Sequence, residues 1–122
     1  MQKRIEIKGE NGEMISVPMR ADAAVPILYR RFFSRDIFQD LGKMAAGLPR
    51  KKKTEAETLS QMDLQMISNL AYTFAKRADK EITDDVFEWL SQFDMMGILE
   101  SAEDIIGMWY QNANTSSVAK KN

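Results

Sequence analysis

The side chains best able to do chemistry in this sequence are carboxylates, which gather in two groups. Asp84, Asp85 and Glu88 form the first, and Glu100, Glu103 and Asp104 form the second. Carboxylate oxygens can hold Mg²⁺ or work as an acid–base pair. Asp84 and Asp85 are adjacent, so on a helix they diverge by about 100°, which favours helix N-terminal charge over a metal site. Glu100 and Asp104, four residues apart, form a like-charged pair that suits a basic partner or has no role.

The chain contains neither histidine nor cysteine. This composition excludes Ser-His-Asp and Cys-His catalysis, zinc sites built from these ligands, and disulfides. The six glycines form neither a dinucleotide-binding fingerprint nor a phosphate-binding loop. We therefore expect no catalytic residues, no cofactor and no metal, and a protein that works by binding other proteins.

Charge is unevenly distributed, although the net charge is only −1. Residues 23–53 carry eight basic and two acidic side chains, whereas residues 79–104 carry nine acidic and one basic. Such asymmetry can steer a partner or drive head-to-tail self-association; the alternative is that these are solvated helix faces of opposite sign.

The length of 122 residues fits one domain. No apolar run approaches the roughly 20 residues that cross a bilayer, and the first residues do not resemble a signal peptide. We expect a mainly α fold with a short N-terminal β-hairpin (α+β) and about five helices. The domain spans 1–111, with the hairpin at 3–20 and a flexible basic loop at about 48–58. A flexible polar tail follows at 112–122.

The hairpin is predicted by alternating apolar residues on either side of Asn11-Gly12, two residues that tolerate positive φ. Pro18 cannot donate a ladder hydrogen bond, so it marks an edge or the end of a strand. A two-stranded hairpin is marginal alone. It must pack on helices or pair with the edge of another chain.

All five expected helices have an apolar stripe, and all but the third have a start signal. The start signals, in chain order, are Asp22 with Pro26, Ser34 with Asp36, Thr83, and Asp94. For the first two helices we expect an apolar stripe at Ile27, Leu28, Phe32, Ile37, Phe38, Leu41, Met44 and Ala45. For the third we expect one buried face at Leu59, Met62, Met66, Ile67, Leu70, Ala71, Phe74 and Ala78. For the last two we expect Val86, Phe87, Leu90, Met95, Ile98, Leu99, Ala102, Ile105, Ile106 and Trp109.

Nine methionines are many for this length. Methionine is flexible and polarisable, so it fills cores and also forms adaptable binding surfaces. Met95 and Met96 are adjacent, and at least one of them should face away from the core. The candidate partner-binding residues are therefore Met95, Met96, Glu100, Asp104, Arg30 and Arg31.

The order of motifs resembles a known family. Residues 29–36 read Tyr-Arg-x-x-Phe-x-Arg-Asp, residues 69–72 read Asn-Leu-Ala-Tyr, residues 88–90 read Glu-Trp-Leu, and a final helix ends at Trp109. Over most of the chain this pattern is similar to the small tail assembly chaperones of long-tailed phages and prophages of Gram-positive bacteria. Ser34 departs from it, because the resemblance leads us to expect glycine before Arg35-Asp36.

The resemblance implies a function. Such chaperones coat the tape measure protein, keep it soluble and help recruit tail tube subunits while the tail is assembled. They act in the host cytoplasm, are not retained in the mature virion, lack enzymatic activity and tend to form homo-oligomers. A frameshift-extended form often exists, and Lys120-Lys121-Asn122 is compatible with an A-rich slippery site.

An alternative interpretation is a small helical regulator that binds nucleic acid through the basic 30–53 region, including Arg50 to Lys53. The isoelectric point of about 5.5 argues against it, because nucleic-acid modules usually carry a basic footprint. No aromatic residue is interleaved in the basic tetrad for stacking on bases.

Overall fold

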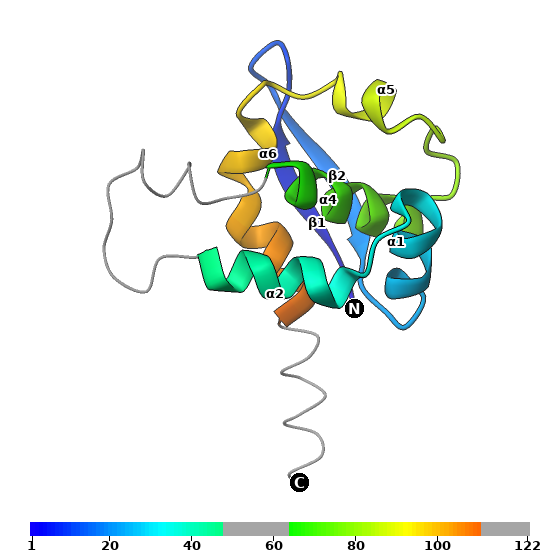
Figure 1. Cartoon of the computed structure of the whole chain (residues 1–122). Coiled ribbons are helices and arrows are strands. Elements are labelled where there is room, and N and C mark those ends of the chain that lie inside the picture. Colours follow the sequence, from blue (N-terminus) through cyan, green and yellow to red (C-terminus); the bar gives the residue numbers. More distant parts are fainter. Residues whose placement is uncertain (48–63, 111–122) are drawn as a thin grey trace, which may run out of the picture.

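The computed structural model describes residues 1–47 and 64–110. In these residues an antiparallel hairpin is followed by helices that pack against one of its faces (Figure 1). The elements are β1 (Gln2–Lys8), β2 (Met14–Arg20), α1 (Val25–Phe33), α2 (Ile37–Gly47), α4 (Leu64–Ala78), α5 (Val86–Leu90), α6 (Gly97–Glu100) and a helical stretch at 102–110. The expected class, mainly α with a short N-terminal hairpin, is confirmed. The basic loop at about 48–58, the tail at 112–122, Leu59, Met62 and the side chains of Met44 and Ala45 lie outside the described residues.

The hairpin places its apolar residues on one face. Ile5 pairs with Val17 and Ile7 with Ile15 in the antiparallel register, and alternation along each strand sends these side chains toward the helices. Only Gly12 of the turn takes a positive φ, 90°. Its N–H donates to the Gly9 carbonyl at 3.0 Å. The loop is therefore of the three-residue kind, with glycine at the left-handed position.

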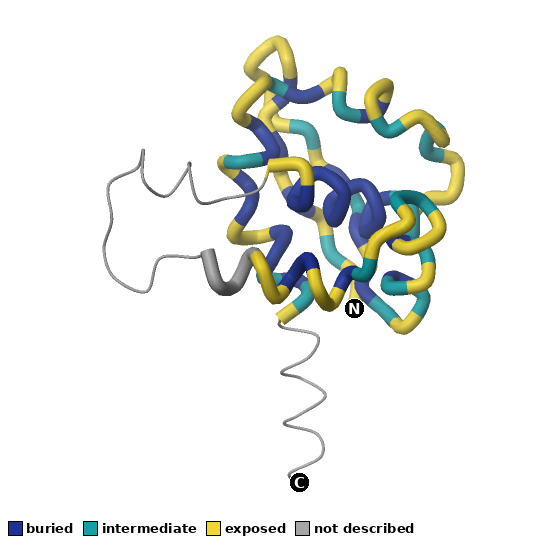
Figure 2. Tube along the Cα trace, in the orientation of Figure 1, coloured by how far each residue is buried: buried dark blue, intermediate teal, exposed yellow. Residues whose placement is uncertain are grey.

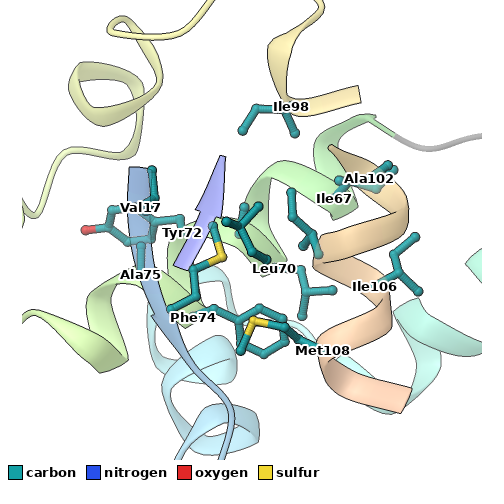
Figure 3. Packing of buried hydrophobic residues seen from close by; sticks show 14 of the residues in the cluster. Val17, Ile67, Leu70, Tyr72, Phe74, Ala75, Ile98, Ala102, Ile106 and Met108 are labelled. Carbon is teal, nitrogen blue, oxygen red and sulfur yellow. The ribbon is translucent and has the colours of Figure 1, made fainter. Parts of the chain in front are cut away.

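α4 runs through the centre of the molecule and is buried on every side. Ten consecutive residues, Met66 to Ala75, are buried, so the predicted single buried face was wrong. β2, α1, α5 and α6 all contact this helix, and Figure 2 shows its trace buried along most of its length. In Figure 3, Phe74 of α4 lies beside Met108 of the 102–110 stretch. Buried polar side chains of α4 can find hydrogen-bond partners within the helix: the Thr73 hydroxyl donates to the Asn69 carbonyl at 2.8 Å.

The boundary between α1 and α2 differs from the prediction. Ser34 does not begin α2: it ends α1 in the left-handed region, with φ 56°, and its N–H donates to the Arg30 carbonyl. Asp36 is the residue whose side chain accepts the Phe38 N–H, at 2.8 Å, at the start of α2. Asp22 likewise lies too early to cap α1. It accepts the Ala24 N–H, while the cap position itself, Ala24, has no side-chain bond.

After α4, the helices begin and end at residues other than those predicted. Asp85, not Thr83, is the N-cap of α5, and its carboxylate accepts the N–H groups of Phe87 and Glu88. The expected fifth helix is divided at Ser101 into α6 and the 102–110 stretch. At this break in the helix, the Ser101 hydroxyl donates a hydrogen bond to the Glu6 carbonyl of β1 at 2.8 Å. This bond attaches the helical end of the chain to the hairpin.

A chain of edge-to-face aromatic contacts joins α1, α4 and α5. Phe32 lies 5.5 Å from Tyr72, Tyr72 lies 5.6 Å from Trp89, and Trp89 lies 4.9 Å from Phe93, between ring centroids. Tyr29 and Phe33 extend the chain within α1 at 5.4 Å. Such pairs each add about 0.5–1.5 kcal/mol beyond area burial. The aromatic residues of the sequence motifs therefore build the core.

Candidate protein-binding surface

Two large apolar side chains stand exposed where α1 meets α2. Ile27 and Phe38 are each 63% exposed, so their expected places in the buried stripes were wrong. Between them lies a groove of about 350 Å³, called here the α1–α2 groove, which is lined by Pro26, Ile27, Arg30, Asp36, Ile37 and Phe38. An apolar groove with a polar rim is typical of a protein-binding site.

A buried polar contact fixes the angle between the two helices that carry this groove. The Tyr29 hydroxyl of α1 donates to Asp40 Oδ2 of α2 at 2.7 Å. Arg35, in the connection, donates to both oxygens of the same carboxylate at 2.8 Å. The left-handed turn at Ser34 brings Arg35 back toward α2. The walls of the groove therefore rest on a satisfied hydrogen-bond network.

The ionisation of this network follows from its geometry. Charge-assisted hydrogen bonds from Arg35 hold the pKa of Asp40 below its usual range; the Tyr29 bond acts in the same direction, and burial acts against both. Burial, followed by the bond to Asp40, raises the pKa of Tyr29 well above its ordinary value. Tyr29 therefore stays neutral as a donor and Asp40 stays charged as an acceptor near pH 7.

The apolar surface continues onto the last helical stretch. The Phe38 ring packs edge-to-face on Trp109 at 5.6 Å. Trp109 is half-buried, and Tyr110 beside it is 38% exposed. The surface thus joins two parts of the chain that are distant in sequence.

The six residues predicted as a binding site form two separate groups. Arg30 and Arg31 are exposed on α1, where Arg30 lines the groove and places a cation on its rim. Met95, 85% exposed, and Met96, 40% exposed, precede α6, which lies on the opposite side of α4 from α1 in Figure 1. Met95 was wrongly placed in a core stripe.

Glu100 and Asp104 complete the second group. Both are exposed, at the end of α6 and in the 102–110 stretch. Glu100 ends α6, which Met95 and Met96 precede, whereas the α1–α2 groove is lined by one cation, Arg30, and one anion, Asp36.

Several other acidic residues of 79–104 serve local structure. Asp79, Asp85 and Asp94 each accept the N–H of the residue two positions later, at 3.0 Å, the geometry of an Asx turn. Asp84 pairs with Lys76 at 2.9 Å. Within residues 1–47 and 64–110, no three acidic side chains converge as a metal site would require.

Ile27 was not predicted as a groove residue because the apolar stripe of α1 was expected on the side of the helix that is exposed. Val25 and Tyr29 are the fully buried residues of α1, and they are four positions apart. Ile27 lies two positions from each, which places it on the opposite side of a helix. Phe87, 77% exposed, was wrongly assigned inward in the same way, since Trp89 takes the buried position on α5.

Comparisons with family models, curated proteins and solved structures found no match to this chain. Among the described residues, no helix has both the length and the apolar character needed to cross a membrane.

Proposed function

We propose that this protein is a phage tail assembly chaperone that binds the tape measure protein through the α1–α2 groove and keeps it soluble during tail assembly. The observation that carries the proposal is the joint exposure of Ile27 and Phe38 beside the groove. A long helical client presents apolar side chains at i, i+3 and i+4, which suit such a groove. Arg30 and Asp36 line the groove with one charge of each sign, which suits a client helix that carries both signs of charge on its flanks.

The motif residues behind the family resemblance support the proposal through their structural roles. Tyr29 and Arg35 converge on Asp40, and Trp89 belongs to the aromatic chain. The resemblance leads one to expect glycine at the position of Ser34. That position has the left-handed φ that glycine adopts most easily, so the expected residue fits this fold.

The remaining parts of the proposal follow from the same resemblance. The protein has no enzymatic activity, acts in the cytoplasm of the bacterial host and is absent from the mature virion. It helps recruit the tail tube protein, forms a homo-oligomer, and is accompanied by a frameshift-extended form of itself. The uneven charge along the sequence, basic over 23–53 and acidic over 79–104, suits such self-association.

Co-expression with the long helical protein encoded just downstream tests the proposal. We expect the client to become soluble and to co-purify. Phe38→Ser should lower co-purification by about tenfold, the size of a binding hot spot. Phe87→Ser is the matched control, because Phe87 is at least as exposed but lies on α5 outside the groove.

Thermal unfolding of both variants separates lost binding from lost folding, since Phe38 also contacts Trp109. A client that stays insoluble beside folded wild-type protein contradicts the proposal. Binding that Met95→Ser abolishes and Phe38→Ser leaves intact would move the site to the Met95–Met96 side. DNA binding that falls steeply with salt would favour the nucleic-acid regulator instead.

A further inference from the structure

The outer edge of β2 carries backbone groups that the fold leaves open. Hydrogen bonds of the hairpin join odd-numbered residues, as at Met1 and Ala21, which bond at 2.8 and 3.0 Å. Because antiparallel pairs alternate, even-numbered residues of both strands direct their N–H and C=O groups outward. On β1 the outward Glu6 carbonyl is already used, because it accepts from the Ser101 hydroxyl. The edge that is open to a further strand is therefore that of β2.

In the middle of this edge, Ser16 directs both its N–H and its C=O away from β1. Within the described part of the chain, the one hydrogen bond to these two groups is a 3.4 Å contact from Arg4 Nη1 to the carbonyl. Pro18, the next outward residue, has a carbonyl but no N–H. Ser16 is therefore the position where an added strand can both donate and accept. Open edges of this kind are templates for an extended chain.

The side chain of Arg4 crosses β2 and brings a cation to this edge. Arg4 lies opposite Pro18, on the same face of the hairpin as Ser16. Its Nη1 lies 3.4 Å from both the hydroxyl and the outward carbonyl of Ser16. Both contacts are long, the side chain is exposed, and among the described residues Arg4 forms no ion pair with a carboxylate. A carboxylate can therefore bind this guanidinium without displacing a strong contact.

The other charges of this face leave Arg4 as the nearest one to an added strand. Alternation places Glu6, Lys8 and Arg20 on the same face, and Arg20 is paired with Asp22 at 3.0 Å. Glu6, the one anion that the two strands place on this face, would lie two strand spacings, about 9–10 Å, from an added strand. That distance is about one Debye length at physiological ionic strength. The central residue of an added strand therefore meets a cation.

A groove lies beside this edge and is called here the β2 edge groove. It has a volume of about 400 Å³, and its lining includes Ile15 and Val17 of β2 and Trp89 of α5. Its far wall is the 82–92 segment, which Figure 1 shows arching beside the hairpin. Hydrogen bonds from α4 and from the hairpin turn hold the two ends of that segment, so the groove is preformed.

The geometry of strand pairing assigns a chemistry to each position of the occupant. In an antiparallel pair, the residue opposite Ser16 exchanges two backbone hydrogen bonds with it and directs its side chain to the same face, where Arg4 favours a carboxylate. Its two neighbours point to the other face, beside Ile15 and Val17, and should be aliphatic. Glu88 lines the groove from α5, on the side of the helices, so acidic residues are disfavoured at these neighbouring positions.

We propose that the β2 edge groove binds an extended segment of a partner protein in which one acidic residue stands between aliphatic residues. The segment adds a third, antiparallel strand to the hairpin, with its acidic residue opposite Ser16 and beside Arg4. This site is separate from the α1–α2 groove and takes a strand rather than a helix. It does not depend on the proposed chaperone function.

A synthetic peptide tests the proposal without any client protein. The probe is Thr-Val-Thr-Val-Glu-Val-Thr-Val-Thr with both ends blocked, which has about the length of a long strand and a single charge. We expect a Kd below about 1 mM and, at saturation, amide hydrogen exchange at Ser16 that is slower by about tenfold or more. The Val17 amide faces β1 in the free protein, so its exchange should change little.

A double-mutant cycle isolates the contact with Arg4. Arg4→Gln should weaken binding of the glutamate peptide by about two- to fivefold, the effect of one exposed ion pair. The same variant should leave unchanged the binding of a peptide with glutamine at the centre. Lys8→Gln is the matched control, because it removes a cation from the same face at the end of the hairpin, opposite Met14. It should alter binding of the glutamate peptide by less than about twofold.

Two controls test whether the peptide pairs as a strand. A peptide N-methylated at the glutamate and at the nearest threonine on either side cannot donate to β2, and it should not bind. Ser16→Pro removes the outward N–H and should abolish binding of the glutamate peptide, with thermal unfolding to verify that the variant is folded. The N-methylated peptide gives the same test on the wild-type protein.

Absence of binding by the glutamate peptide at about 1 mM overturns the proposal. Equal binding of the N-methylated peptide, or of a peptide with lysine at the centre, overturns it as well. Protection of Ser16 that grows with protein concentration in the absence of peptide also overturns it, because a second copy of this chain then occupies the edge. None of these results bears on whether Phe38 binds the client.

Discussion

The hydroxyl group of Tyr29 lies 2.7 Å from Asp40 Oδ2 and donates a hydrogen bond to it. Arg35 approaches the same carboxylate from the connection between the helices. One neutral donor and one cation thus converge on a single buried anion. Because Ile27 and Phe38 are carried by the two helices that this anion joins, the geometry of the α1–α2 groove depends on Asp40.

Asp40→Asn should lower the free energy of unfolding by about 1–3 kcal/mol at pH 7, since it weakens charge-assisted bonds to a buried group. Folding lowers the pKa of Asp40 from an ordinary value of 3.8. The contribution of Asp40 to the free energy of unfolding is therefore complete above about pH 4. It is lost as the pH falls through the lower pKa that Asp40 has in the folded protein. Urea unfolding between pH 7 and pH 2 should show that the free energy of unfolding falls less with decreasing pH in the variant than in the wild type.

The matched control for this experiment is Asp104→Asn, which changes an exposed carboxylate and should alter stability by less than about 0.5 kcal/mol. If the free energies of unfolding of Asp40→Asn and the wild type fall in parallel as the pH is lowered, Asp40 is not held ionised by Arg35.

Ser34→Gly should raise stability by about 0.5–1 kcal/mol. Ser34 has φ 56°, where a Cβ atom is strained and glycine is not. Ser91 is the contrasting control: it also ends a helix, but with φ −64°, so Ser91→Gly should destabilise. Denaturant unfolding of the two variants compares them directly, and changes of the same sign would contradict the explanation.

Gly97→Ala should destabilise by about 1–3 kcal/mol, as an overpacked substitution does. A Cβ at Gly97 would lie 2.6 Å from the Lys8 carbonyl oxygen, a backbone atom that cannot move alone. Gly107→Ala places its Cβ in open space within a helical stretch, where alanine usually adds about 0.5–1 kcal/mol. Thermal unfolding should therefore rank the wild type between the two; Gly97→Ala as stable as the wild type would mean that α6 does not pack closely on β1.

The sequence predicted the elements of this fold better than their boundaries. The hairpin and the helices were foreseeable because Asn11-Gly12 and the apolar periodicity are local signals. Ser34 was misassigned because serine suits a helix start, and only its left-handed φ shows that it ends α1. Thr83 was misassigned for a similar reason: Asp85, two positions later, accepts the α5 N–H groups.

The candidate surface was harder to predict than the fold. Burial of α4 on every side depends on how many elements surround it, which a single helical period does not encode. Ile27, Phe38 and Phe87 are apolar residues in helices, and periodicity alone assigns such residues to a core. Only the positions of Tyr29, Asp40 and Trp89 in three dimensions show which side of each helix is free.

The Ser101 hydroxyl and the Glu6 carbonyl are 95 residues apart in the chain. At a synthesis rate of about 5–20 residues per second, roughly 5–20 s separate the appearance of the first strand from that of its last partner. During that interval β1, which carries the buried residues Ile5 and Ile7, lacks α6, which contacts it in the folded protein. The fold of the described residues is therefore expected to be completed only after residue 101 has been translated, as one cooperative unit rather than segment by segment.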